Sequence, residues 1–291
     1  MVEATSIWEF VRRFPDDLSC LNHILDTKFG VDRVCNRCGV ANSVWLKSNH
    51  KVASCYQCGV VVRPMANTML HHSRIAPRVW FYAMLLFANM PRGTPAHFLE
   101  RHLSISHKAA WRLGHSIRRH IACLRIGQAR IFSNPSYSVQ IDETILKNVV
   151  DISGNSSSVL VMGIWSREGI MTFPLRDRSK DSIIENICQL VDRRVNIITD
   201  DFASYASLSS RGYQHARITH SKGIWVDGNG NNTCGIDSYW SYLKRYFRTT
   251  YKRVSMENVI SYLKEAEYRY DCSRKGEDMF LKMISSFPDI R

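Results

Sequence analysis

The sequence lacks an apolar run that could cross a bilayer, and its first residues lack the features of a secretory signal. Its longest apolar run, at residues 79–90, falls short of the about 20 residues that a membrane-spanning helix needs. The opening segment MVEATSIWEFVRRF carries acidic residues inside a short apolar pattern and has no small-residue cleavage site. These absences predict an intracellular protein with no membrane partner.

Acidic residues are also scarce relative to basic ones. The 291-residue chain has 26 Asp and Glu against 39 Lys and Arg, which gives a net charge of +13. Such an excess suggests a polyanionic partner, because contacts with phosphates would dominate the affinity. Charge alone is a moderate hint, since proteins that never meet nucleic acid can carry the same surplus. The length is sufficient for two or three small domains with cores of their own.

The cysteines do not form the even set that a disulfide framework requires. There are nine, and four of them form two pairs, Cys35-x2-Cys38 and Cys55-x2-Cys58, with the spacing of paired zinc knuckles. We therefore predict a zinc ribbon over residues 31–70 with a structural Zn²⁺, because four thiolates leave no open coordination position. The alternative, four free buried thiols, fits this spacing poorly. Basic residues around the module either meet phosphates or form a solvated face, and both interpretations stay open: Arg33, Arg37, Lys47, Lys51 and Arg63.

The segments on either side of this module have helical patterns. Apolar spacing predicts short helices in an N-terminal segment, residues 1–30. Residues 71–130 are predicted to be helical and to contain a helix-turn-helix, with Ser104 or Ser106 capping its second helix. The alternative is an ordinary helical hairpin, and Trp111 is interpreted as a core residue. We expect the second helix to bind DNA through its basic residues: Lys108, Arg112, Arg118 and Arg119.

Three acidic residues in the second half of the chain are placed where they can share one site. Asp142 lies in the predicted strand VQIDETIL, Asp200 ends the apolar strand of VNIITDD, and Asp237 lies in the helical pattern GIDSYWSYLKRYF. By themselves, acids at such positions are more often solvated or capping residues. Together they can hold a pair of divalent cations such as Mg²⁺, a hard ion that prefers oxygen ligands. Glu143 is not taken as a ligand, because it points away from Asp142 in a strand, and neither is Asp201.

The order of these motifs is specific. VQIDET, TDDFASY and then HSKGIW followed by NTCGIDSYWSYLKRYFRTTY resemble the DDE transposases of the Merlin superfamily and related bacterial insertion-sequence transposases, over nearly the whole chain. The resemblance implies an α+β multidomain protein, in which N-terminal helices, a zinc ribbon and a helix-turn-helix precede an RNase H-like domain, residues 135–275, with a mixed sheet flanked by helices. The pattern agrees, since a hairpin at 159–175 and a helix at 179–194 precede the strand of Asp200. Residues 276–291 are expected to be a C-terminal tail.

The resemblance also implies roles for the site residues. Asp142, Asp200 and Asp237 would form the carboxylate triad that binds catalytic Mg²⁺ or Mn²⁺. His220 matches a histidine of the family's VNHS-like segment and would position a phosphate or a metal-bound water, although a loop histidine is more often a local hydrogen-bonding residue. A basic cluster on or after the same helix as Asp237 would contact DNA beside the active site: Lys244, Arg245, Arg248 and Lys252.

The implied function is that of a DNA transposase, which binds the terminal inverted repeats of a transposon and a target duplex. The enzyme would cleave a strand and transfer the resulting 3′-hydroxyl to a target phosphodiester, as a homodimer or higher homo-oligomer on DNA. The protein would be DNA-associated, in a nucleus or in a bacterial cytoplasm and nucleoid.

Three positions depart from the family pattern. Asp237 stands where the family usually has Glu, Cys234 stands where it commonly has Asn, and residues 249–252 replace a Gly-Thr-Tyr-His turn. These differences favour, as an alternative, a domesticated or inactive transposase-derived protein that binds DNA without moving it. A third interpretation is a metal-dependent nuclease that cuts without strand transfer.

Overall fold

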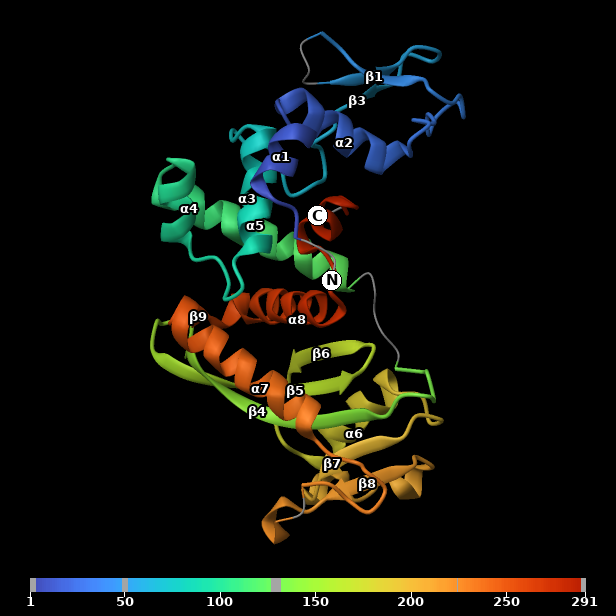
Figure 1. The fold of residues 1–291 in the computed structure, drawn as a ribbon, viewed down its shortest axis with the longest axis vertical. Helices are drawn as coiled ribbons and strands as arrows, with labels where there is room; N and C mark the ends of the chain where they lie inside the picture. Colours follow the sequence, from blue (N-terminus) through green and yellow to red (C-terminus); the bar gives the residue numbers. More distant parts are fainter. Residues whose placement is uncertain (1–3, 49–51, 127–131, 224, 289–291) are drawn as a thin grey trace. The chain divides into compact units, whose positions relative to one another are not determined.

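Figure 1 shows the fold in a computed structural model, which describes residues 4–48, 52–126, 132–223 and 225–288. The chain divides into two units, one made of Met1–Gly127 with Cys272–Arg291 and the other of Gln128–Asp271. Each unit has its own secondary structure and its own packed core.

Helices and a small antiparallel sheet build the first unit. Its elements are α1 (Ile7–Arg13), α2 (Asp17–Phe29), β1 (Val44–Leu46), β2 (Ala53–Cys55), β3 (Val61–Val62), α3 (Pro77–Asn89), α4 (Ala96–Leu103) and α5 (His107–Ile126). Ser6 and Glu9 form a capping box at the start of α1, and Asp16 and Ser19 form another at the start of α2. These two helices are the short helices predicted for residues 1–30. Within the described residues, no helix combines the length and the apolar character needed to cross a membrane.

Helices α4 and α5 form the predicted helical pair, joined by a short turn. α4 ends at Ser104, whose φ of 51° lies in the left-handed region. α5 begins after Ser106, whose hydroxyl oxygen accepts a hydrogen bond from the N–H of Ala109 at 3.3 Å. Of the two serines considered as caps, Ser106 is therefore the one that closes the first turn of α5. Leu99 of α4 and Leu113 of α5 are both buried.

The end of the chain belongs to the first unit and contains a further helix, α9 (Met279–Ile284). The N–H and the hydroxyl of Thr5 both donate to the carboxylate of Asp278, at 2.6 and 2.5 Å. At the other end of α9, Nε2 of His120 lies 2.8 Å from the carbonyl oxygen of Met283. Burial lowers the pKa of His120 to about 4, so at neutral pH the uncharged ring donates this hydrogen bond. The predicted C-terminal tail therefore contains a docked helix.

A mixed sheet is the centre of the second unit, in the strand order β6-β5-β4-β7-β8. Its elements are β4 (Val139–Val150), β5 (Ser156–Ser166), β6 (Gly169–Pro174), α6 (Lys180–Leu190), β7 (Ile197–Asp200), β8 (His215–Ile218), α7 (Cys234–Tyr246), β9 (Val254–Ser255) and α8 (Val259–Lys275, in this unit to Asp271). β4, β5 and β6 are antiparallel neighbours, whereas β7 and β8 run parallel to β4. This is the strand order of an RNase H-like fold, so the predicted fold class is confirmed.

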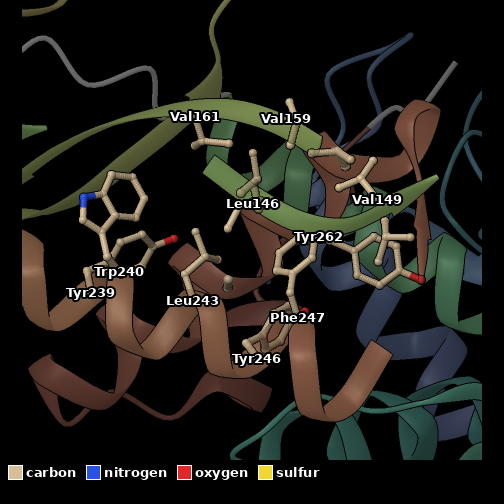
Figure 2. Close-up of a cluster of buried hydrophobic side chains, with 14 of the residues drawn as sticks. Leu146, Val149, Val159, Val161, Tyr239, Trp240, Leu243, Tyr246, Phe247 and Tyr262 are labelled. Carbon is tan, nitrogen blue, oxygen red and sulfur yellow. The ribbon is translucent and has the colours of Figure 1, made fainter. Parts of the chain in front are cut away.

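Two apolar cores cover the two faces of this sheet, because side chains alternate between faces along each strand. Helix α6 covers one face through Ile183 and Ile187. It ends at Leu190, earlier than predicted, because Val191 leaves the helix to form an isolated bridge with Phe132. Helices α7 and α8 cover the other face with a core rich in aromatic side chains, which Figure 2 shows against the strands: Tyr239, Trp240, Leu243, Tyr246, Phe247, Tyr262, Leu146, Val149, Val159 and Val161.

Side chains of α8 cover the edge of the sheet at β6. The N–H of Ile170 donates to Asp271 at 3.2 Å, and both the N–H and the hydroxyl of Thr172 donate to Glu267 at 2.7 Å. Nζ of Lys264 returns a hydrogen bond to the carbonyl oxygen of Thr172 at 2.8 Å. These groups take the place of a neighbouring strand, so the edge cannot pair with another chain.

Candidate metal centre and carboxylate site

The four paired cysteines come together in the first unit. Their sulfur atoms all lie within 4.8 Å of one another, with 3.7 Å between Cys35 and Cys58 and 3.7 Å between Cys38 and Cys55. Four sulfur ligands at about 2.3 Å from one Zn²⁺ in a tetrahedron lie about 3.8 Å apart. A disulfide would bring two sulfur atoms to about 2.05 Å. The geometry therefore fits a single tetrahedral ion such as zinc and excludes disulfides between these pairs.

The two cysteine pairs sit in matching turns. Within each turn the first cysteine's N–H donates to a carbonyl five residues later at 3.0 Å, and its carbonyl accepts from the N–H of Gly39 or Gly59, which have φ of 72° and 69°. Backbone N–H groups of Cys38 and Arg37 point at the sulfur of Cys35 and lower its pKa. The turn thus favours the thiolate form of Cys35, which is the form that binds metal, whereas the neighbouring cysteine sulfurs raise the pKa of Cys38.

Asp142 is held by a side chain of α7. The indole N–H of Trp240 in α7 donates to its Oδ2 at 2.8 Å. This contact needs α7 to lie very close to the sheet, and Gly163, the residue paired with Asp142 on β5, makes that possible. A methyl group on Gly163 would meet the Trp240 ring at 2.7 Å and Ile236 at 2.8 Å. Asp142 therefore faces α7, as it must if it is to bind the same cation as a residue of α7.

Asp200 lies at the carboxyl end of β7, level with Asp142. The parallel register pairs Gln140 with Ile198, and two residues further along the same register reach Asp142 and Asp200, on the same face. Gln140 fixes that face, because its Oε1 accepts the N–H of Ile236 in α7 at 2.9 Å. The N–H of Phe202 donates to Asp200 at 3.0 Å and holds the turn after the strand.

Asp237 lies in the first turn of α7 and is exposed. The hydroxyl of Thr233, the residue before α7, donates to Asp237 Oδ2 at 2.7 Å. Because that hydroxyl has one proton, Nε2 of His220, 3.1 Å from Thr233 Oγ1, must be the donor in its own bond. Within the described residues, Nδ1 of His220 is buried and has no partner. His220 is thus connected to Asp237 through Thr233.

The three carboxylates affect one another electrostatically. Burial raises the pKa of Asp142 to about 6, and repulsion from Asp200 and then from Asp237 adds to this effect, against the indole hydrogen bond. Among the described residues, however, only the four cysteines form a group of three or more metal-binding side chains within 4.8 Å of one another. The aspartates are therefore near enough to repel but stand further apart than ligands gathered on one ion.

Glu143 and Asp201 are the acidic neighbours of Asp142 and Asp200 that the sequence analysis did not take as metal ligands. Glu143 faces the opposite core and accepts a hydrogen bond from the hydroxyl of Tyr205, and burial raises its pKa to about 7. Tyr205 follows Asp200 by five residues. This bond therefore connects the segment after β7 to β4 on the face of the sheet that α6 covers. Asp201 is exposed and accepts a hydrogen bond from Ser221 at 3.3 Å.

Three of the four basic residues predicted on α5 are exposed, namely Lys108, Arg112 and Arg119. Arg118 is different, with only 3% of its surface exposed. Its guanidinium donates to the carbonyl oxygen of Thr94 at 3.0 Å and lies over the ring of Phe87. Gly114 provides the space, since a methyl group there would lie 3.2 Å from Arg118 Nη1. The assignment of Arg118 as a DNA-binding residue is therefore corrected, because this side chain is part of the core.

The interpretation of Trp111 is also corrected. It was interpreted as a core residue, but 49% of its surface is exposed, with its ring 4.0 Å from that of His115.

In the second unit, the predicted basic cluster is exposed throughout: Lys244, Arg245, Arg248 and Lys252. Around the cysteines, Arg33 is buried and paired with Asp26 at 2.6 Å, and Lys51 lies outside the described residues. The exposed members of that group are Arg37, Lys47 and Arg63.

Comparison with known proteins gives a family match in the second unit. Residues 138–271 match the family model of the ISXO2-like transposase domain. A protein of Halobacterium salinarum, described as an uncharacterized protein in transposable element ISH50, is 23% identical over 256 residues, which cover 79% of this chain and 82% of that protein. The crystal structure of a pre-cleavage Mos1 transpososome covers 64% of this chain and 77% of its own, at 8% identity and a TM-score of 0.24, a value too low to carry an argument.

The match to the transposase domain model confirms the predicted resemblance to insertion-sequence DDE transposases. Residues 138–271, which match that model, contain all three aspartates and His220. This match, together with the relative from a transposable element, supports a transposase.

We expect the purified protein to contain one Zn²⁺ per chain, measured by elemental analysis with the thiols kept reduced. Cys35→Ser should lose the metal and unfold the ribbon, because metal binding supplies the folding free energy of such small modules. Cys188→Ser is the matched control, since Cys188 is exposed in the second unit and should keep the zinc. Protein with intact thiols and no zinc would contradict the assignment.

We expect Asp142→Asn to stabilise the protein at pH 7.5 when zinc is retained and no other divalent cation is added. The pKa of Asp142 in the folded protein, about 6, exceeds the ordinary value of 3.8. Between these two pH values the folded protein therefore binds more protons than the unfolded protein, and it loses stability as the pH rises through this range. The asparagine keeps an oxygen for the Trp240 N–H but carries no charge. Thermal unfolding should show a gain of about 1–3 kcal/mol at pH 7.5 and little gain near pH 4. A variant less stable than wild type at pH 7.5 would contradict the electrostatic account.

Proposed function

We propose that the protein binds the ends of its transposable element as double-stranded DNA, cleaves a strand there and transfers the free 3′-hydroxyl to target DNA. The observation that supports this proposal most directly is the position of Asp142 and Asp200 at the same level of two neighbouring strands, facing the helix that carries Asp237. This arrangement lies inside the region that matches the transposase domain family.

In this proposal Asp142, Asp200 and Asp237 hold catalytic Mg²⁺ or Mn²⁺. The donor set fits, because carboxylate oxygens are the ligands that these ions prefer. Burial raises the pKa of Asp142, and repulsion from Asp200 and Asp237 adds to the shift, so a bound cation would stabilise its charged form. When bound, two such ions activate the attacking oxygen and stabilise the leaving oxygen of a phosphoryl transfer.

The residues around the carboxylates set their positions. The Trp240 indole orients Asp142, and Thr233 orients Asp237. His220 supports Thr233 by donating its Nε2 proton, so its role in this proposal is to position the third carboxylate. That role differs from the contact with a phosphate or metal-bound water implied by the family resemblance.

DNA would be held by exposed basic surfaces in each unit. On α5 these are Lys108, Arg112 and Arg119, and in the second unit they follow Asp237 along and beyond α7: Lys244, Arg245, Arg248 and Lys252. Lys244 is seven residues after Asp237, which corresponds to about 10 Å along the helix. A homodimer or higher homo-oligomer on DNA belongs to the same proposal, because two transposon ends must be joined.

A second candidate is a transposase-derived protein that binds DNA without cutting it. Two observations favour it: Asp237 has one methylene less than the usual Glu of the family, and the three carboxylates do not gather within 4.8 Å as the cysteines do. In that case DNA binding would be retained and the carboxylates would have no catalytic role.

We expect cleavage of a duplex taken from the DNA that flanks this gene to require Mg²⁺ or Mn²⁺ and all three aspartates. Asn at position 142, 200 or 237 removes a charged ligand and should reduce cleavage at least about 100-fold, as is typical when a group that stabilises the transition state is lost. Binding of the same duplex, measured by anisotropy, should change little.

Asp201→Asn is the matched control for this experiment, because Asp201 is an exposed neighbour of Asp200 and should leave cleavage intact. Asp237→Glu tests the third ligand, since it restores the family's usual side chain and should retain or raise activity. Cleavage by Asp237→Asn at the wild-type rate would remove Asp237 from the site. Binding by the wild type without any cleavage would favour the second candidate.

A further inference from the structure

An exposed tryptophan lies beside the carboxylate site. Trp225 follows the short helical turn His220–Lys222, and 63% of its surface is exposed. Its neighbour Val226 is 54% exposed, and the loop around them is rich in Gly and Asn. A large aromatic side chain left in solvent within such a polar loop suggests a surface that is covered when a ligand binds.

The ring of Trp225 is joined to the site through a chain of side chains. Its centroid lies 4.7 Å from that of His220, with the two rings tilted by 46°. His220 donates to Thr233, and Thr233 donates to Asp237. Trp225 is therefore separated from the third carboxylate by two side chains.

The loop that follows Trp225 is ordered by its own hydrogen bonds. Val226 forms a bridge with Asn232, and the N–H of Asp227 donates to the carbonyl oxygen of Asn231 at 3.0 Å. The carboxylate of Asp227 accepts the N–H groups of Asn229 and Asn231 at 2.9 and 2.8 Å. Trp225 is thus presented at the base of a fixed turn, so little entropy is lost when a ligand stacks on it.

A second exposed aromatic residue is hydrogen-bonded through its backbone to a different carboxylate. Phe202 is 37% exposed, and its N–H donates to Asp200. Lys222, three residues before Trp225, is also exposed. Aromatic rings together with cations are the groups that bind unpaired nucleotides, because rings stack on bases while cations contact phosphates.

We propose that Trp225 is a stacking platform for an unpaired DNA base next to the phosphate that is cleaved. The base must be unpaired, because a base inside a duplex is already stacked on both faces and cannot reach a protein ring. This proposal rests on the proposed function. It adds that the transposon end is bound with one base turned out of the double helix, on the side of the site where Asp237 lies.

The test is the binding of a short single-stranded oligonucleotide that contains 2-aminopurine, whose fluorescence falls when it stacks on an aromatic ring. The wild type should bind it and quench its fluorescence. Trp225→Ala should bind about 10-fold or more weakly, as expected for the loss of one base stack, and should lose the quenching. Trp225→Phe keeps a ring and should retain most of both effects.

Trp8→Ala is the matched control, because Trp8 is 81% exposed in the first unit and should bind as the wild type does. Asp142→Asn protein separates this proposal from the proposed function, since it should quench normally although it does not cleave. Normal binding and quenching by Trp225→Ala would overturn the proposal. So would a change in oligomeric state without a change in quenching, because Trp225 would then contact protein instead of a base.

Discussion

The carboxylate site depends on how closely α7 approaches the sheet. A helix packed on a sheet usually stands off by the thickness of side chains from both layers, but here Gly163 contributes none, and Trp240 and Ile236 fill its place. The same close approach lets the Trp240 indole reach Asp142 and lets Gln140 reach the backbone of Ile236. Asp237, one residue further along α7, is thereby brought to the edge where the strands carry Asp142 and Asp200.

This packing opposes the repulsion between the acids. Burial raises the pKa of Asp142, and repulsion from Asp200 and Asp237 adds to the shift. The free energy for holding the three carboxylates near one another comes from the aromatic core of α7 and α8. On the opposite face, the hydrogen bond between Tyr205 and Glu143 fixes the segment after Asp200. The arrangement holds the carboxylates near one another before a cation binds, which is the kind of preorganisation that an oxygen-ligand site requires.

Much of the fold and part of the site could be predicted from the sequence, where the signal is local. The cysteine pairs have a fixed spacing, and the strands of Asp142 and Asp200 have clear apolar patterns. Thr233 could also have been found, because it precedes α7 and stands four residues before Asp237. The contacts made by Trp240 and Tyr205 could not be predicted, since each joins residues more than 60 positions apart. Arg118 was assigned wrongly because its burial depends on packing between helices: the space that it occupies is created by Gly114 of its own helix and by Phe87 of α3.

The most direct test of this account is the affinity of Gly163→Ala for Mn²⁺, measured by titration on protein whose fold has been verified by circular dichroism and whose zinc is retained. The added methyl group must move α7 away from the sheet, so all three aspartates remain but their spacing changes. We predict that Mn²⁺ binds at least about 10-fold more weakly than to the wild type, a loss of about 1.4 kcal/mol. Folded Gly163→Ala protein that binds Mn²⁺ as tightly as the wild type would contradict the claim that the approach of α7 builds the site.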